Sequence, residues 1–132
     1  MATRLEEIVR GLDFAPSDSI LEIGCGVGVA ADLICRRLRR GRLIALDRSA
    51  KMIAAAERRN ADHIAVGLAE FHTVAMEEFD PGRRRFDLVL AVRVGLFQRE
   101  PERARAIVGR WLKPGGKLVA IHDEPLARSR RA

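Results

Sequence analysis

Three glycines at alternate positions end a short apolar run near the amino end of the chain. The run Ser19–Ile23 is typical of a buried strand, and a helical pattern begins directly after the glycines. The glycines are Gly24, Gly26 and Gly28. Glycine lacks a Cβ and adopts positive φ, so a ligand can lie close to such a turn, facing the N–H groups that begin the helix. The stretch therefore predicts a binding site for a nucleotide-like molecule.

One acidic side chain narrows the class of ligand. Glu22 lies inside the predicted strand, two positions before the first glycine. A dinucleotide would bring its diphosphate to this turn, and the carboxylate of Glu22 would repel that charge. A cofactor with a cationic amino-acid end would instead be attracted, directly or through water. Glu22 thus favours the second kind of ligand.

This segment resembles the first motif of the class I S-adenosylmethionine (SAM)-dependent methyltransferases, acidic-x-Gly-x-Gly-x-Gly. Two later segments are similar to motifs of that family, FDLV at 86–89 and LKPGGKL at 112–118. The resemblance covers residues 18–121. It implies a Rossmann-like methyltransferase with SAM as cofactor and S-adenosylhomocysteine (SAH) as product. It also implies cofactor contacts within this motif, at Glu22, Gly24, Cys25, Gly26 and Gly28.

Asp47 is the second informative residue. It closes the predicted strand 42–46 roughly 20 residues after the glycine turn, where nucleotide-binding α/β folds place an acid for the ribose hydroxyls. A cap of the following helix is the other interpretation of Asp47, but Ser49 is available for that role. The resemblance further implies that Arg48 lies flat against the adenine ring.

After the third strand the family usually has Gly-Asp-Ala, and this aspartate binds the adenine amino group. Residues 74–76 read Val-Ala-Met here, so Ala75 stands at the position of the acid. The backbone N–H of Met76 remains for the ring, and Glu77 or Glu78 would have to supply a carboxylate from another position. Ala91, near the end of the fourth strand, is the last cofactor contact that we expect.

The methyl acceptor is expected beside the carboxyl ends of the last two strands. Arg93 is the only charge in the segment 91–98, and it either binds an acidic group of the substrate or is a surface cation. Phe97 either covers the pocket or packs in the core. His122 and Glu124 are candidate substrate contacts after the fifth strand, but their cluster lacks the spacing of metal ligands. Methyl transfer from a sulfonium needs the donor and nucleophile held in line, so we assign no catalytic side chain.

Strands and helices alternate along the chain. Patterns predict strands over Ser19–Ile23, 42–46, 69–74, Phe86–Val92 and 117–121, and helices over 3–12, 28–39, 49–66 and from Pro101 onward. This order indicates an α/β protein with a parallel sheet and right-handed crossovers. The expected architecture is a three-layer Rossmann-like sandwich with strand order 3-2-1-4-5. The last two strands usual in the family are missing, so the fifth strand is an open edge through which a homodimer could form.

The 132 residues suit a single domain, 1–132, in which a basic tail over 126–132 is expected to be flexible. No apolar run is long enough to span a membrane and no signal-peptide core is visible, so we expect a cytoplasmic protein. The net charge of +6 comes mostly from arginine clusters. We interpret these clusters as solvated faces, with nucleic acid as the alternative partner.

Three functions are compatible with these motifs. The first is a methyltransferase that moves a methyl group from SAM to a small molecule by in-line displacement. The second is a SAM-binding module that is catalytically degenerate or depends on a partner chain. The third is an NAD(P)-linked oxidoreductase, because Gly26, Gly28 and Ala31 also satisfy Gly-x-Gly-x-x-Ala. Glu22 opposes the third function, and so does the lack of any tyrosine for a Tyr-x-x-x-Lys pair.

Overall fold

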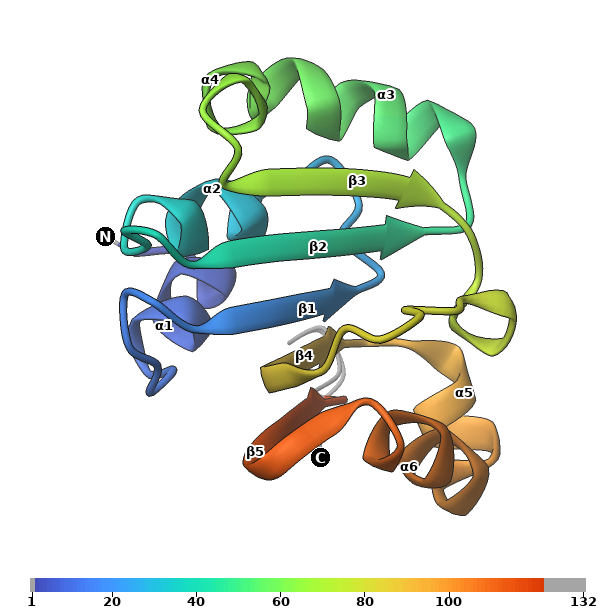
Figure 1. Cartoon of the computed structure of the whole chain (residues 1–132). Helices are drawn as coiled ribbons and strands as arrows, with labels where there is room; N and C mark the ends of the chain where they lie inside the picture. The colour runs from blue at the N-terminus through green and yellow to red at the C-terminus, as the bar shows by residue number, and fades with distance from the viewer. Residues whose placement is uncertain (1, 123–132) are drawn as a thin grey trace.

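Five parallel strands form the centre of the molecule. The computed structural model describes residues 2–122, in which the strands follow the order β3-β2-β1-β4-β5 (Figure 1). Their bounds are β1 Ser19–Ile23, β2 Arg42–Asp47, β3 Ala69–Thr73, β4 Phe86–Val92 and β5 Leu112–Ile121. All four strand pairings are parallel. The predicted α/β class and sheet order are therefore confirmed.

Helices cover both faces of this sheet (Figure 1). They are α1 Arg4–Arg10, α2 Val29–Cys35, α3 Ala50–Arg59, α4 Ala61–Ala65, α5 Gly95–Arg99 and α6 Pro101–Gly109, with a short 3-10 helix, η1 Met76–Glu78. Successive side chains of a strand point to opposite faces. Ile20 of β1 accordingly packs with α1, α2 and α3, whereas Leu21 packs with η1, α5 and α6. Two apolar clusters on either side of one sheet produce the predicted three layers.

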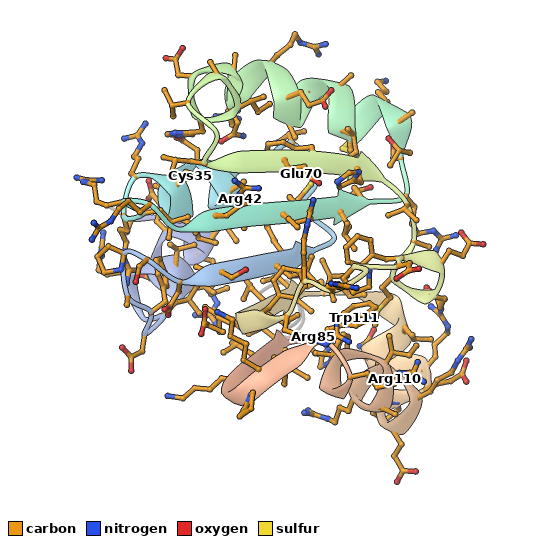
Figure 2. The ribbon with its side chains drawn as sticks, viewed as in Figure 1. Cys35, Arg42, Glu70, Arg85, Arg110 and Trp111 are labelled. Atoms are coloured by element: carbon orange, nitrogen blue, oxygen red, sulfur yellow. The ribbon has the colours of Figure 1, made fainter. Side chains whose placement is uncertain are left out.

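Trp111 belongs to the second of these clusters. Labelled in Figure 2, it lies directly before β5 and is 6% exposed. Its ring meets Phe79 edge-on, with the centroids 5.4 Å apart. Such an aromatic pair adds to the apolar area that the tryptophan buries, so it fastens the segment after η1 against the start of β5.

The predicted helix 49–66 is wrong, because it is divided at Asn60 into α3 and α4. The Asn60 side chain is buried, and its Nδ2 donates to the carbonyls of Ala56 at 2.9 Å and Gly28 at 3.1 Å. A side chain that binds nearby backbone carbonyls competes with helix continuation. The chain turns here, so Ile64, which the helical spacing predicts on the buried face, is 37% exposed.

Other boundaries differ from the prediction as well. The helix predicted over 28–39 ends at Cys35, and the N–H of Arg39 donates to the carbonyl of Pro16 at 2.7 Å. The last strand begins at Leu112 and not at 117, because Leu112 pairs with Phe86 before a shift in register. Neither η1 nor α5 was predicted, since each is too short to show a period.

Arg37 holds α1 against α2, and its replacement tests this packing. Its guanidinium donates to the carbonyls of Val9 at 2.8 Å and Leu12 at 2.9 Å, and lies 4.0 Å from the ring centroid of Phe14. We expect Arg37→Met to lower the free energy of unfolding by about 2 kcal/mol, because two carbonyls lose charged donors. Urea denaturation measures this change.

The matched control is Arg36→Met. Arg36 is exposed and forms an i,i+4 ion pair with Asp32, with 3.0 Å between nitrogen and oxygen. Pairs of this kind contribute about 0.5 kcal/mol or less. Equal losses in the two variants would contradict a specific role of Arg37.

Candidate functional site

A cavity of about 250 Å³ lies at the carboxyl ends of the strands. In Figure 1 the arrowheads of β1, β2 and β3 all point toward this side of the molecule. Strand β1 lies between β2 and β4, so the chain order reverses here, and open α/β sheets bind ligands at such a point. The wall comprises Ile23 and Gly24, the segment Leu46, Asp47 and Arg48, the segments 74–77 and 92–96, and Arg99.

Asp47 ties the end of β2 to the glycine turn. Its Oδ2 accepts a hydrogen bond from the N–H of Gly26 at 2.9 Å, and its Oδ1 accepts one from the N–H of Ser49 at 2.9 Å. Ser49 caps α3, because its hydroxyl oxygen accepts from the N–H of Met52. The predicted cap is thus confirmed, and the half-buried carboxylate of Asp47 is held in one orientation on the cavity wall.

Two glycines of the turn are required for different reasons. At Gly28, where φ is 87°, a Cβ would lie 2.6 Å from Nδ2 of Asn60 and 3.0 Å from Ala56. The missing side chain therefore lets α2 begin against α3. At Gly26, where φ is 55°, a Cβ would meet no atom within 4 Å. One glycine serves internal packing, and the other leaves open space at the turn.

Glu22 is a buried acidic residue with an unusual pKa. Its side chain is 4% exposed in β1, directly before the turn. Burial, and to a lesser extent the charge of Asp47, raises the pKa of the Glu22 carboxyl to about 8. Its Oε1 has no hydrogen-bond partner. Buried polar atoms are nearly always paired in folded proteins, so this oxygen is an unsatisfied polar atom beside the glycine turn.

Some of the predicted cofactor contacts lie on the cavity wall, and others do not. On the wall are Gly24, Asp47, Arg48, Ala75 and Met76. Glu22, Cys25, Gly26, Gly28 and Ala91 are not part of the wall. Ala91 is fully buried, and alternation along β4 places Val92 on the wall in its place. Burial raises the pKa of the Cys25 thiol to about 12, which fits a small filler and not a reactive thiolate.

Of the predicted substrate contacts, Arg93 lies on the cavity wall. Phe97 packs in the apolar cluster of α5 and is 2% exposed, with its ring centroid 6.1 Å from that of His122. His122 carries a buried Nδ1 that lacks a hydrogen-bond partner. Glu124 lies outside the described residues. Substrate contacts of Phe97, His122 and Glu124 stay predictions.

The structure adds wall residues that the sequence analysis missed. Ile23, Leu46, Val74 and Val92 are apolar residues at or just after the ends of β1 to β4, and the others come from α5 and the turn before it, where the charged one is Arg99. Gly95 and Arg99 are four residues apart and therefore lie on one face of this helical turn. That spacing is the signal that could have placed Arg99 near Gly95, but five residues do not establish a helix from sequence.

Comparison with known proteins decides the family of this fold and site. A family model described as a methyltransferase domain matches residues 20–116. The chain belongs to this methyltransferase family. The predicted kinship with the SAM-dependent methyltransferases is confirmed, and SAM is the cofactor of the family.

Individual relatives resemble this methyltransferase domain over most of its length. It is 36% identical over 126 residues to a ubiquinone biosynthesis O-methyltransferase of Bradyrhizobium diazoefficiens, covering 88% of this chain and 44% of the relative. Coclaurine N-methyltransferase bound to N-methylheliamine and SAH has a TM-score of 0.76 at 16% identity, covering 88% and 34% of the two chains. The cyclase SpnF has a TM-score of 0.74 at 23% identity, covering 88% and 42%. The domain spans less than half the length of the curated relatives that it matches.

Proposed function

We propose that this methyltransferase domain binds SAM across the cavity and the adjoining glycine turn, at the ends of β1 and β2, and methylates a small molecule. One observation carries the proposal. The fixed carboxylate of Asp47, the open side of Gly26 and the unpaired Oε1 of Glu22 all gather at the turn between β1 and α2. Together they supply acceptors for ribose hydroxyls and for a cationic amino-acid end, next to backbone that has no side chain in the way.

The residues on the wall fit the parts of SAM. Asp47 would hold the ribose, Arg48 would lie against the adenine, and the N–H of Met76 would reach the ring edge. The acid that the family usually has at position 75 is absent, and Glu77 is our candidate to replace it. Glu77 lies on the cavity wall, whereas Glu78 lines a separate hollow beside β3.

When bound, SAM supplies a methyl group that its sulfonium charge activates for in-line displacement by an acceptor atom. The protein then has two tasks, to fix the reactants and to exclude water. Val92, Val94 and Leu96 give the cavity an apolar side for the second task. No described side chain is assigned as a general base, since the reaction class does not demand one.

A second candidate function is SAM binding without methyl transfer. The alanine at position 75 favours it, because the adenine would lose one hydrogen bond. The cyclase SpnF shares this fold, so the fold alone does not determine methyl transfer. An NAD(P)-linked activity is disfavoured because the sequence contains no tyrosine for a Tyr-x-x-x-Lys pair.

Location and assembly are also proposals. No helix among residues 2–122 is long and apolar enough to cross a membrane. Cys25 and Cys35 are free and buried, which supports a reducing, cytoplasmic location. Strand β5 is an outer strand of the sheet in residues 2–122, which supports a homodimer through this edge. Nucleic acid remains the alternative partner, and the net positive charge of the chain supports this alternative.

Calorimetric titration tests the proposed function. We expect SAH and SAM to bind with dissociation constants on the order of micromolar, which corresponds to about 8 kcal/mol, and NAD to show no heat of binding. Transfer of labelled methyl groups from SAM to a panel of small acceptors then separates the first candidate from the second. Binding of NAD but not SAH would overturn the proposal, and SAH binding without any transfer would support the degenerate module.

A further inference from the structure

The charges on the cavity wall are unevenly distributed. Asp47 stands at the end of β2, on the side of the glycine turn. Arg93 and Arg99 stand on the opposite side, in the segment after β4 and in α5. The wall also carries Arg48, next to Asp47, and Glu77 in η1, so this side holds two acids and one arginine, whereas the second side holds two guanidinium groups and no acid of the wall. A guanidinium binds carboxylate and phosphate groups in a two-pronged geometry, so the second side suits an anion.

Arg99 is placed at this wall by the absence of a side chain at Gly95. Its Nη1 occupies the space that a Cβ on Gly95 would need. The guanidinium therefore folds back over the first turn of α5. Arg99 is exposed, and no carboxylate of residues 2–122 forms an ion pair with it. Its charge is thus directed to the cavity without being neutralised by the described chain.

Arg93 is placed by its backbone. Its φ is 56°, a left-handed conformation that is uncommon for residues other than glycine. Its N–H donates to the carbonyl of Ile121 at the end of β5, with 2.7 Å between nitrogen and oxygen. The neighbouring strand thereby holds the start of this side chain on the wall. Such strained residues persist where the surrounding structure determines them, and they cluster at functional sites.

We infer that the methyl acceptor is a small organic anion whose acidic group binds to Arg99, with Arg93 as the second cation. This inference rests on the proposed function, because it needs SAM on the other side of the same cavity. The amino-acid end of SAM carries a carboxylate of its own, and this is the other anion that the two arginines could bind. The carboxyl groups of Asp47 and Glu22, next to the open side of Gly26, favour the glycine turn for the amino-acid end of SAM and leave the arginines to the methyl acceptor.

Two substitutions test the inference by different means. Arg99→Gln removes the charge, while Gly95→Ala keeps the charge and moves it, because the new methyl group displaces the end of a flexible side chain. Gly95→Ala should leave folding intact, since no positive φ is involved and only Arg99 must shift. The matched controls lie on α6. Arg105 is exposed, and a Cβ on Gly109 would meet no atom within 4 Å, so we choose Arg105→Gln and Gly109→Ala.

The probes are benzoate and its neutral counterpart benzamide, titrated calorimetrically into wild-type protein and variants saturated with SAH. We expect the wild-type protein to bind benzoate with an affinity about tenfold higher than that for benzamide, because one charge-assisted hydrogen-bonded pair provides a gain of this size. Arg99→Gln should abolish this preference, and Gly95→Ala should reduce it by roughly threefold or more. Both controls should keep it, and all variants should bind SAH with wild-type affinity.

Three other results would contradict the inference or the proposed function. A wild-type protein that binds SAH but does not prefer benzoate would overturn the inference and leave the proposed function in place. SAH binding weakened by Arg99→Gln, with no change in the benzoate preference, would assign the arginines to the cofactor and overturn the inference. A wild-type protein that binds no SAH would overturn the proposed function, and the inference with it.

Discussion

Asp47→Ala is expected to weaken SAH binding by roughly thirtyfold, or about 2 kcal/mol. The carboxylate accepts hydrogen bonds from the N–H groups of Gly26 and Ser49, and both are lost with it. The acceptor that we propose for the ribose is lost at the same time. The turn also becomes free to move away from β2, so binding would have to order it again. Calorimetric titration of SAH into wild type and variant measures the effect.

The design separates binding from folding. Asp62→Ala is the control, because Asp62 is exposed on α4 and distant in sequence from the turn; it should leave SAH affinity unchanged. If Asp47→Ala proves too unstable, Asp47→Asn keeps the shape of the side chain and one carbonyl acceptor, and should show an intermediate loss of affinity. Unchanged SAH affinity in a folded Asp47→Ala variant would refute the ribose role.

The sheet could be predicted because its signals are local. Apolar runs mark each strand, and alternation with helices determines parallel pairing, so β1 and β4 match their predicted bounds. The break at Asn60 could not be predicted, because its cause is a hydrogen bond to Gly28, 32 residues away in sequence. The early start of β5 likewise depends on pairing of Leu112 with Phe86. Contacts of this range have no signature in a periodic pattern.

The site was predicted to a similar extent and for similar reasons. Asp47 and the turn carry a motif, so their position at the ends of β1 and β2 could be read directly. Arg99 carries none, and it reaches the wall only because Gly95 leaves space for it. The sequence also shows the acid at position 22, but it does not predict whether this carboxyl is protonated in the folded protein. Burial of the side chain raises its pKa and so sets that state, and burial is a property of the assembled core.

The pH dependence of stability should reveal that protonation state. Below about pH 4.5 the Glu22 carboxyl is protonated in both the folded and the unfolded protein, so its titration does not lower the free energy of unfolding. Between 4.5 and about 8 it is ionised in the unfolded chain but protonated in the fold, so folding takes up a proton and becomes less favourable as pH rises. The loss is about 1.4 kcal/mol per pH unit, with an upper limit of about 5 kcal/mol over the window.

Glu22→Gln isolates this contribution, because glutamine has the same shape and does not titrate. We expect the free energy of unfolding of the cofactor-free protein to fall between pH 5 and 8 in wild type and to fall much less in the variant. Urea denaturation across this range measures both slopes. Their difference cancels the groups that the two proteins share. Among these, Asp32, Glu70 and Asp87 have lowered pKa values, and their stabilisation is complete above about pH 5.

Glu57→Gln, on the exposed face of α3, is the control and should keep the wild-type slope. The buried thiols do not interfere, since the pKa of Cys35, like that of Cys25, is raised to about 12 and its effect begins only above the window. Equal slopes for wild type and Glu22→Gln would mean that Glu22 is already ionised in the fold. A cofactor with a cationic end would then bind next to an ionised Glu22, and its binding would not require the release of a proton from this carboxyl. A steeper wild-type slope means that binding such a cation must release that proton, so SAM would stabilise the protein more at pH 8 than at pH 6.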